Sequence, residues 1–356
     1  MAIFISYESE VLMIEIDGSY GEGGGQILRT ALAFSSIIKI PVRVKNIRVN
    51  RKKPGLGIQH LAGVNALARI SGATIEGNRI GSQTLTFIPQ EIRSGVYEFK
   101  IETAGSVTLL LQALFLPLCL GHGESALTLA GGTHVPWSPP YHYFSQIFLP
   151  TLEPMGGSAE MMIERWGFYP KGGGRVQLRI RPIDRVKPIS LVERGLLKKV
   201  SGISVISNLP EHVAERQRVQ ALKRIRRELK IEPEIDVLYN APSIGQGSFL
   251  FLLAEYEGIV AGFSSLGARG KPAEKVADEA VNFLKSYLES NGCVDPHLAD
   301  QLVPFMALAK GNSSLTTTQM TEHLLTNLWV IAHFMERKIQ TSGEPGRAGR
   351  VDFFNE

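Results

Sequence analysis

The sequence has 356 residues, of which 44% are hydrophobic and 20% are charged, and its formal net charge is +4. No uncharged apolar run reaches the roughly 18 residues that cross a bilayer, so the composition predicts a protein without a membrane partner. The length favours two domains, and the small net charge makes the location of the basic residues more informative than their sum.

The cysteines and the first residues bear on the cellular compartment. Cys119 and Cys293 are too few for a disulfide framework or a cysteine-based zinc site, which fits a reducing cytoplasm. The N-terminal stretch MAIFISYESEVLM has neither a basic start nor a cleavage signal, and the first strand is predicted near Met13. We therefore expect a cytoplasmic protein that is not exported.

The first motif, SYGEGGGQILRT at residues 19–30, places three consecutive glycines before a helical pattern. Glycines at the start of a helix let backbone N–H groups approach a phosphate closely. The stretch lacks the Lys-Ser/Thr of a P-loop and the last glycine of the dinucleotide motif. By itself it predicts either a tight structural turn or an anion site.

Helical patterns and short strands then alternate along the chain. Apolar residues at three- and four-residue spacing predict helices over residues 26–38, 59–71, 106–120 and 141–155. Strands are predicted at 73–77 and 84–89, and a second glycine run at 172–174 leads into an alternating strand at 176–180.

The same alternation returns at the C-terminal end. Helices are predicted over residues 274–290, 297–309 and 322–335, with a strand at 313–318 before the last of them. The whole pattern predicts an α+β fold in which a module of one sheet and two helices is repeated about three times.

Residues 185–272 interrupt this alternation. Strand patterns at 201–207, 234–240, 248–258 and 259–267 surround a strongly basic helix at 211–230. We expect a smaller α/β domain inserted into the last repeat, which leaves residues 1–184 and 273–356 for the large domain.

The basic helix of this segment has two interpretations. Its cations could neutralise the phosphates of a nucleic acid: Arg216, Arg218, Lys223, Arg224, Arg226 and Arg227. The interpretation that we prefer is a solvated face opposite an apolar stripe of Val213, Val219, Leu222, Ile225 and Leu229.

Basic residues also gather in the loop RVNRKKPGLGIQH, where Arg48, Arg51 and two lysines lie within six positions. Gln59 and His60 open the next helix. Guanidinium groups match phosphate oxygens in pairs, so these arginines, together with Arg29 beside the glycine loop, predict a polyanion pocket.

The C-terminal helices carry the other candidate. Asp300 and Gln301 fall in the opening turn of HLADQLVPFMALA, and His323 falls in the opening turn of EHLLTN. A histidine at such a place is commonly an exposed or capping residue. The positive end of the helix dipole would nevertheless keep the ring neutral, with a free lone pair, as a nucleophile requires.

Seven motifs in this order give the sequence a resemblance: GEGGGQILR, RVNRKKPGLGIQH, TAGSVTLLLQ, GGTHVPWSPP, GFYPKGGGRV, HLADQLVPFMALA and EHLLTN. Together they resemble the RNA 3′-terminal phosphate cyclase family over nearly the whole chain. The resemblance implies three repeats, each with two helices on a four-stranded sheet, similar to the C-terminal domain of translation initiation factor three. A smaller domain would be inserted in the last repeat.

The resemblance also implies a reaction. It would use ATP and a divalent metal, magnesium or manganese, to convert an RNA 3′-phosphate into a 2′,3′-cyclic phosphate. A histidine would first be adenylylated at the expense of ATP. The AMP would then pass to the RNA 3′-phosphate, and the neighbouring 2′-hydroxyl would displace it. RNA and ATP are the implied partners, and the sequence is compatible with a homo-oligomer.

Carried over position by position, the resemblance assigns the nucleophile to His323 and places Glu22 near the triphosphate and the metal. The nucleotide would be held by Gln112, Pro136, His297, Asp300 and Gln301, with Pro136 and His297 flanking adenine. The phosphates of ATP or of the RNA end would be engaged by Arg29, Arg48, Arg51, Gln59 and His60. His297 stands where many relatives are expected to have tyrosine, which bears on the strength of adenine stacking.

Two other functions fit parts of the sequence. A cyclase-like ribosome-assembly protein of the same fold would not adenylylate and should lack the histidine that is present at position 323. A transferase of the enolpyruvyl type would also bind phosphate with basic residues, but it would need neither His323 nor ATP.

Overall fold

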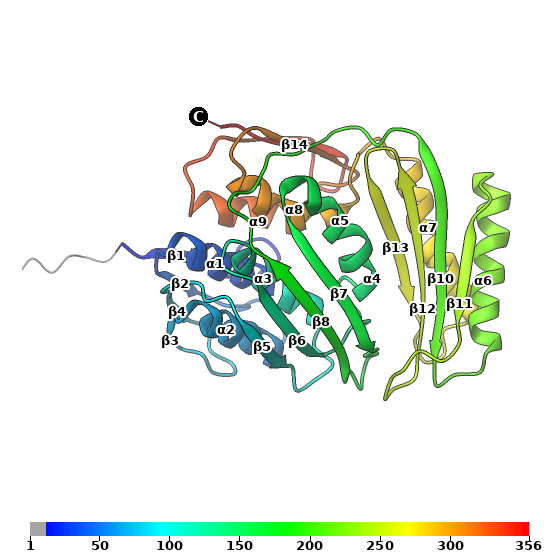
Figure 1. The fold of residues 1–356 in the computed structure, drawn as a ribbon, viewed down its shortest axis with the longest axis horizontal. Helices are drawn as coiled ribbons and strands as arrows, with labels where there is room; N and C mark the ends of the chain where they lie inside the picture. Colours follow the sequence, from blue (N-terminus) through cyan, green and yellow to red (C-terminus); the bar gives the residue numbers. More distant parts are fainter. Residues whose placement is uncertain (1–11, 356) are drawn as a thin grey trace, which may run out of the picture.

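Four four-stranded sheets and the helices packed on them make up residues 12–355, which the computed structural model describes (Figure 1). The mixed α and β fold class expected from the sequence is thereby confirmed. The first strand begins at Ile14, close to the predicted position, whereas the interpretation of residues 1–11 falls outside the described part of the chain.

The first sheet has the strand order β1-β2-β4-β3. Its elements are β1 (Ile14–Asp17), α1 (Gly25–Ile38), β2 (Val42–Lys45), α2 (Ile58–Ser71), β3 (Thr74–Glu76) and β4 (Leu85–Ile88). Because β1 and β2 are parallel, α1 has to cross between them, and this connection carries the glycine-rich motif to one end of the sheet.

The second sheet repeats this order as β5-β6-β8-β7. Its strands are β5 (Val96–Lys100), β6 (Ser125–Gly131), β7 (Ser158–Arg165) and β8 (Gly174–Arg181). Its helices are α3 (Val107–Cys119) and a continuous helical segment of α4 (Tyr141–Tyr143), η1 (Phe144–Phe148), α5 (Leu149–Leu152) and η2 (Glu153–Met155). Inward-facing residues alternate with outward-facing ones along β6 and β8, so one face of the sheet packs on helices.

The third sheet has the order β15-β16-β14-β9, which is the same order read from the other edge. It contains β9 (Ser190–Leu191), α8 (Pro296–Leu308), β14 (Ser313–Thr317), α9 (Glu322–Ala332), β15 (Ile339–Ser342) and β16 (Gly349–Phe353). β9 pairs in parallel with β14, so the chain between them leaves this sheet and later returns to it.

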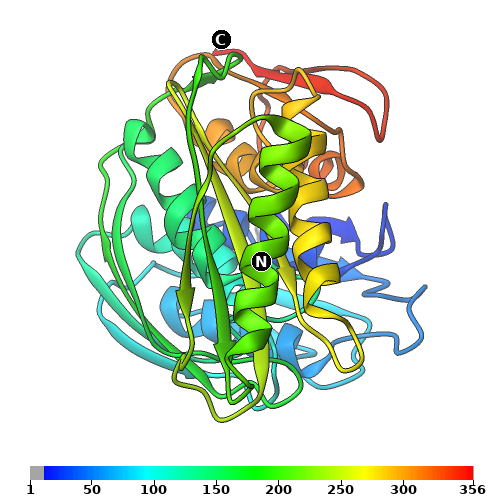
Figure 2. The same ribbon diagram turned by 90° about the vertical axis from the view of Figure 1, so that its right-hand side faces the viewer.

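The fourth sheet lies within that excursion, with the order β11-β10-β12-β13. Its elements are β10 (Leu197–Ser207), α6 (His212–Arg224), η3 (Ile225–Leu229), β11 (Glu234–Leu238), β12 (Gly247–Tyr256), β13 (Val260–Leu266) and α7 (Ala273–Leu288). α6 and α7 lie side by side on this sheet (Figure 2) and share a separate apolar core with it. α7 therefore packs with the excursion, although its sequence lies beyond residue 272.

The predicted apolar stripe of the basic helix is confirmed in part, because Ile225 is buried and Leu222 and Leu229 pack against the core of the fourth sheet. Ala214, Gln217, Ala221 and Ile225 are buried, whereas Val219 is 56% exposed, so the apolar stripe proposed from the sequence is wrong at that position. The burial of small residues brings α6 close to its sheet and leaves the larger valine outside.

Most cations of this helix are paired with carboxylates. Arg216 binds Glu274 on α7, and Arg224 contacts both Glu228 and Asp278. Ion pairs to Glu232 and Glu228 also engage Arg226 and Arg227. This pairing favours a solvated, charge-balanced face over a nucleic-acid surface.

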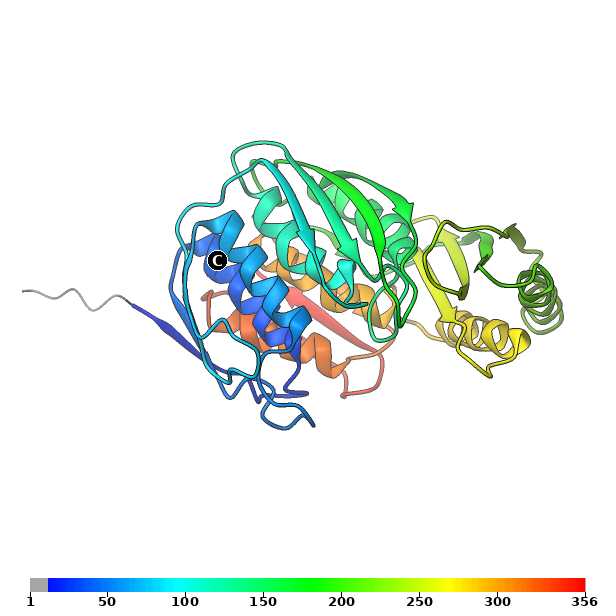
Figure 3. The same cartoon turned by 90° about the horizontal axis from the view of Figure 1, so that it is seen from below.

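Helices occupy the centre of the large part of the molecule, with the sheets outside them (Figure 3). α1 packs against α2, α3 and α9, and α8 packs against α9. Phe115 on α3 meets Phe144 and Phe148 on η1 and Phe305 on α8, which ties the second and third sheets into one core. Among residues 12–355, no helix is both long and apolar enough to cross a membrane.

Candidate functional site

The starts of α1, α2, α3 and α9 meet at one place. A β-carbon on Gly25, the first residue of α1, would lie 2.5 Å from the ring of His60 near the start of α2. Gln59 on α2 accepts a hydrogen bond at 2.9 Å from the backbone N–H of Ser106, which caps α3. Gln26 of α1 reaches the first turn of α9. The glycine at position 25 is therefore required by this close helix packing, and the convergence gathers several positive dipole ends.

His323 lies in the first turn of α9, whose N-cap Thr321 accepts a hydrogen bond from the N–H of Leu324. The imidazole is 48% exposed, and its Nδ1 is 3.7 Å from the Glu22 carboxylate. Burial lowers the pKa of His323, Glu22 opposes this shift, and the cationic side chains of Arg29 and Arg51 add to it. The shift has the direction expected for a helix start, but its first cause is desolvation. The ring is thus neutral and accessible at neutral pH.

Glu22 is held in place by Arg51 from the basic loop. Arg51 Nη2 donates to the Glu22 backbone carbonyl at 2.7 Å and lies 3.6 Å from its carboxylate. Both side chains are partly exposed, and the Glu22 carboxylate faces His323. The glycine loop and the basic loop predicted separately from the sequence therefore form one surface beside the histidine.

Gln26 joins this surface to α8 and was not among the residues predicted for the site. It is buried, and its Nε2 donates to the His323 carbonyl at 3.1 Å and to the Asp300 carboxylate at 3.4 Å. Its Oε1 has no partner among the described residues. The signal in the sequence is a polar residue directly after the glycines, within the first turn of α1.

Asn327 is a second residue that the sequence reading missed. Its Oδ1 accepts from Thr30 Oγ at 2.6 Å, and its Nδ2 donates to the Asp300 carbonyl at 2.7 Å. It follows His323 by one helical turn, so both residues lie on the face of α9 that meets α1. This bridge fixes α9 relative to α1 and α8, and with it the position of the histidine.

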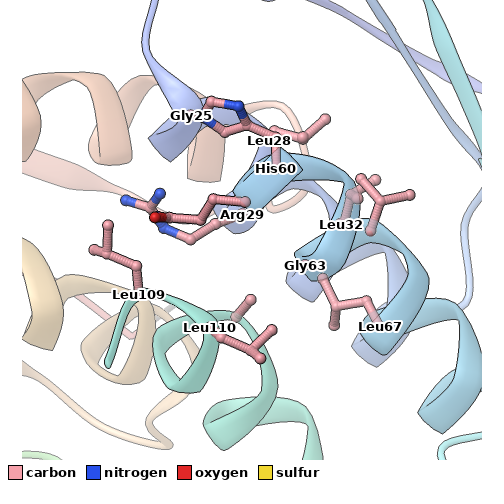
Figure 4. Close-up of a pocket in the computed structure, with 12 residues that line it drawn as sticks. Gly25, Leu28, Arg29, Leu32, His60, Gly63, Leu67, Leu109 and Leu110 are labelled. Atoms are coloured by element: carbon pink, nitrogen blue, oxygen red, sulfur yellow. The ribbon is translucent and has the colours of Figure 1, made fainter. Parts of the chain in front are cut away.

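A cavity between α1, α2 and α3 contains three of the predicted phosphate ligands, Arg29, Gln59 and His60 (Figure 4). Burial lowers the pKa of Arg29 to about 10, and Asp300 opposes this shift. Burial, with Arg48 and Arg29 nearby, lowers the pKa of His60 to about 4. His60 Nδ1 accepts from the Gly57 N–H at 3.1 Å, which leaves Nε2 on the side of Gly25. His60 is therefore a neutral residue packed against the glycine loop.

Arg48 lies at the edge of this group in a left-handed backbone conformation, with φ of 53°. Its Nη1 donates to the Gly55 carbonyl at 2.7 Å. Burial lowers the pKa of Arg48, and the like charge of Arg51 adds to the effect. The guanidinium groups of Arg48 and Arg51 are thus close enough to affect each other, and Glu22 pairs with Arg51. Neighbouring guanidinium groups of this kind can bind a polyanion.

A second cavity lies on the other side of Arg29, between α1, α3, α8 and α9. Its polar lining includes Gln112, Asp300 and Gln301, and its apolar lining includes Phe115, Phe148 and Phe305. The buried Oε1 of Gln301 has no partner among residues 12–355. Burial raises the pKa of Asp300 to about 7, which Arg29 partly offsets. An apolar wall facing unpaired polar groups is the usual build of a small-molecule site.

Pro136 and His297 lie outside the lining of that cavity. Pro136 is exposed in the loop after β6, and His297 is exposed in the first turn of α8. The His297 ring is 6.3 Å from the ring of Tyr143, whose hydroxyl donates to Asp295, the N-cap of α8. His297 therefore lies at the start of α8, and Pro136 lies in a separate loop after β6.

In the described part of the chain, no group of three or more His, Cys, Asp or Glu side chains could hold a metal ion. A magnesium-type ion is commonly bound by one or two carboxylates together with substrate phosphates and water. The exposed carboxylate of Glu22, beside cations that attract phosphate, fits this kind of site.

A neutral, accessible histidine beside arginines at converging helix starts is the arrangement of a phosphate-binding protein with a nucleophile. The family model for RNA 3′-terminal phosphate cyclase matches residues 20–341. The chain belongs to the RNA 3′-terminal phosphate cyclase family.

Similar proteins carry the same name. An RNA 3′-terminal phosphate cyclase from Methanopyrus kandleri is 45% identical over 96% of this chain and 98% of its own length. One from Thermococcus onnurineus is 45% identical over 95% of this chain and 98% of its own length. The solved structure of the enolpyruvyl transferase NikO from Streptomyces tendae aligns over 96% of this chain and 81% of its own chain, with a TM-score of 0.28 and 11% identity. This similarity is too low to bear on function.

Proposed function

We propose that this protein is an RNA 3′-terminal phosphate cyclase that forms its product through a histidine-bound AMP. The overall reaction converts RNA 3′-phosphate and ATP into RNA 2′,3′-cyclic phosphate, AMP and pyrophosphate. The observation that carries the proposal is the neutral, half-exposed His323, which faces Glu22 and lies beside Arg51 and Arg29.

In the first step, His323 attacks the α-phosphorus of ATP and pyrophosphate leaves. Nδ1 faces the Glu22 carboxylate, so Nε2 is the nitrogen free to form the phosphorus–nitrogen bond. Arg29, Arg48 and Arg51 neutralise the negative charge of the triphosphate, and the helix starts add their positive ends. A divalent ion held by Glu22 would neutralise further phosphate charge.

In the second step, an oxygen of the RNA 3′-phosphate attacks the AMP phosphorus, and the bond to His323 breaks. The RNA then carries an adenylate, whose AMP is a good leaving group. In the third step, the vicinal 2′-hydroxyl oxygen attacks the 3′-phosphorus, AMP leaves and the hydroxyl proton is released. Gln59 and His60 would hold the RNA phosphate during these steps, which their shared cavity and the nearby Arg48 support.

The adenosine part of the nucleotide is assigned to the cavity between α1, α3, α8 and α9. The unpaired amide oxygens of Gln26 and Gln301 can accept from ribose hydroxyls or the adenine amino group, and Gln112 and Asp300 line the same space. Pro136 and His297 would flank the base at the mouth. Closure of these residues around adenine is part of the proposal.

The fold supports a division into three modules and one insertion. Three sheets share one strand order and one succession of strands and helices, which agrees with three repeats similar to the C-terminal domain of translation initiation factor three. The packing of α7 on the fourth sheet favours an inserted domain that continues to about the end of α7. The cytoplasmic location and the oligomeric state stay predictions.

A cyclase-like protein that does not adenylylate is the remaining alternative within this fold. It predicts that ATP leaves no covalent label on the chain. The presence of His323, and the named cyclases at 42–45% identity, favour the catalytic interpretation.

The decisive experiment incubates the protein with ATP labelled at the α-phosphate and a divalent metal salt. We expect a protein–AMP adduct that acid releases and alkali does not, as for a phosphoramidate. His323→Ala should fold, because the side chain is half-exposed, and should form no adduct. It should still cyclise an RNA that already carries the 3′-adenylate, because that step needs only the surrounding site. The matched control His60→Ala should still label.

The RNA end gives a second readout. RNA with a 3′-phosphate should be converted, and RNA with a 3′-hydroxyl should not. A label that persists in His323→Ala but disappears in His60→Ala would show that the nucleophile is misassigned, and an unlabelled wild-type protein would refute adenylylation.

A further inference from the structure

Trp137 is unusual in both its exposure and its backbone conformation. Its side chain is 97% exposed, although tryptophan is the largest apolar side chain and is ordinarily well buried. The residue also has a positive φ of 64°, a backbone conformation that costs energy for any residue with a β-carbon. An exposed tryptophan and a strained backbone both cost stability, so a function at this position is expected to offset that cost.

The loop that carries Trp137 is held firmly at both ends. Pro136 precedes the tryptophan, and the Pro139 carbonyl accepts from Thr108 Oγ at 2.6 Å in the first turn of α3. Ser138 Oγ donates to the Val135 carbonyl at 3.1 Å. The indole is therefore presented by a fixed loop.

Two further loops lie beside it. His134 pairs with Phe168, and Phe168 pairs with Gly172, so Tyr169 and Lys171 are at the tip of the neighbouring loop. Trp166 pairs with Ser243, which brings in a third loop. We call residues 132–140, 166–173 and 239–246 the loop platform. Its exposed apolar side chains are Trp137, Tyr169 at 66% and Ile244 at 54%.

An aromatic layer supports the platform from below. The buried ring of His134 stacks on Trp166 at 4.2 Å and meets Phe249 at 4.6 Å. Because these rings belong to the second sheet and to the inserted segment, the three loops cannot shift independently.

The charge and the position of the platform indicate the kind of partner. Its three loops contain no Asp or Glu, and Lys171 makes no ion pair within residues 12–355. A β-carbon on Gly172 would lie 2.7 Å from Cα of Ala104, two residues before Ser106, whose N–H binds Gln59. The platform is thus continuous with the phosphate-binding end of the site.

We propose that the loop platform binds the single-stranded RNA upstream of its 3′-phosphate, with bases stacked on Trp137 and Tyr169. Exposed, rigid aromatic rings on loops without acidic residues, next to a phosphate site, match the way proteins bind single-stranded nucleic acid without sequence preference. This inference rests on the proposed function, because it extends the RNA site of that reaction.

The test compares two RNA substrates that end in a 3′-phosphate, a dinucleotide and an oligonucleotide of about ten nucleotides. Trp137→Ala should raise KM for the longer RNA by about 5- to 150-fold, the range that loss of one stacked base implies. KM for the dinucleotide and labelling of the protein by ATP should not change. Trp137→Phe should retain most of the affinity, and Tyr169→Ala should act in the same direction as Trp137→Ala.

Phe283→Ala is the matched control, because Phe283 is an exposed aromatic residue on α7, far along the chain from the platform. Binding of the longer RNA should also quench tryptophan fluorescence in the wild type more than in Trp137→Phe. Equal KM values for wild type and Trp137→Ala would overturn the inference, as would a loss of ATP labelling in Trp137→Ala, which would place the indole against the nucleotide. Failure of the wild type to label would count against the proposed function, and the fluorescence measurement would still decide whether the platform binds RNA.

Discussion

The buried pair of His134 and His142 should make the protein sensitive to mild acid. His134 Nε2 and His142 Nδ1 are 3.0 Å apart, and the other His134 nitrogen is 2.8 Å from Thr133 Oγ. Burial lowers the pKa of both rings, to about 4 for His142 and well below its usual value for His134, which the neighbouring His142 lowers further. Both histidines are therefore neutral in the folded protein throughout the physiological range.

The free energy of unfolding should fall as the pH falls, because the unfolded state binds protons that the folded state does not. In the unfolded chain each histidine has a pKa of about 6.5, so the unfolded state takes up protons first as the pH falls. Between about pH 7.5 and about pH 5, one histidine that stays neutral in the folded state lowers the free energy of unfolding by about 2 kcal/mol. The pair together should cost about 4 kcal/mol over this interval, which is a large part of a typical stability of about 5–15 kcal/mol.

His142→Asn isolates this contribution, because an amide can keep the hydrogen bond to His134 and does not titrate. Urea unfolding, followed by the fluorescence of Trp166, which stacks on His134, gives the free energy at each pH. Between about pH 7.5 and about pH 5, the free energy of unfolding should fall by about 2 kcal/mol less in the variant than in the wild type. His122→Asn is the control, since His122 is exposed. Identical pH dependence in wild type and His142→Asn would refute the reasoning.

Three further outcomes test the site. Arg51→Lys keeps the charge but loses the planar guanidinium that engages Glu22 and phosphate. Adenylylation should therefore slow by about ten- to a hundredfold while the melting temperature stays unchanged. Full activity would show that the arginine is only a surface residue. Asn327→Ala leaves the Thr30 hydroxyl and the Asp300 carbonyl without a partner, so it should lower the free energy of unfolding by about 2 kcal/mol and slow the labelling of His323. Chemical denaturation and ATP labelling measure these effects. Thr30→Val removes only one hydrogen bond and should cause a smaller loss of stability and a smaller loss of labelling. Because the pKa of His323 lies below its ordinary value, the rate of protein–AMP formation should fall by no more than about twofold as the pH falls from about 8 to about 6.5. A tenfold fall over that range would mean that the reacting group titrates higher.

Local pattern was sufficient to predict most secondary structure. The predicted helices at 26–38, 59–71 and 106–120 agree with α1, α2 and α3 to within about one residue, because each carries an apolar stripe bounded by glycine, serine or a turn. Strands at 313–318 and 234–240 were found for the same reason. The family, too, could be predicted from sequence, since seven ordered motifs are preserved in short local stretches.

Side-chain burial on the basic helix could not be predicted in the same way. Its hydrophobic residues suggested a stripe that included Val219, but the sheet accepts the small residues Ala214 and Ala221 instead. Which face of a helix is buried depends on how closely the partner surface approaches, and periodicity alone does not contain that distance. The limits of the inserted domain stay a prediction, but the packing of α7 on the fourth sheet could not be predicted from periodicity either.

The sequence alone determined the types of side chain available for the chemistry, a histidine and several arginines near glycines and helix starts, because those signals are local. Only the tertiary structure decided that they meet: Glu22 and His323 are 301 positions apart, and their approach to 3.7 Å depends on α1 packing against α9. It also decided the roles of Gln26 and Asn327, whose hydrogen bonds cross between helices that no sequence spacing relates. The physical reason is that helix formation is governed by neighbouring residues, whereas a site built between helices requires the burial of a shared core.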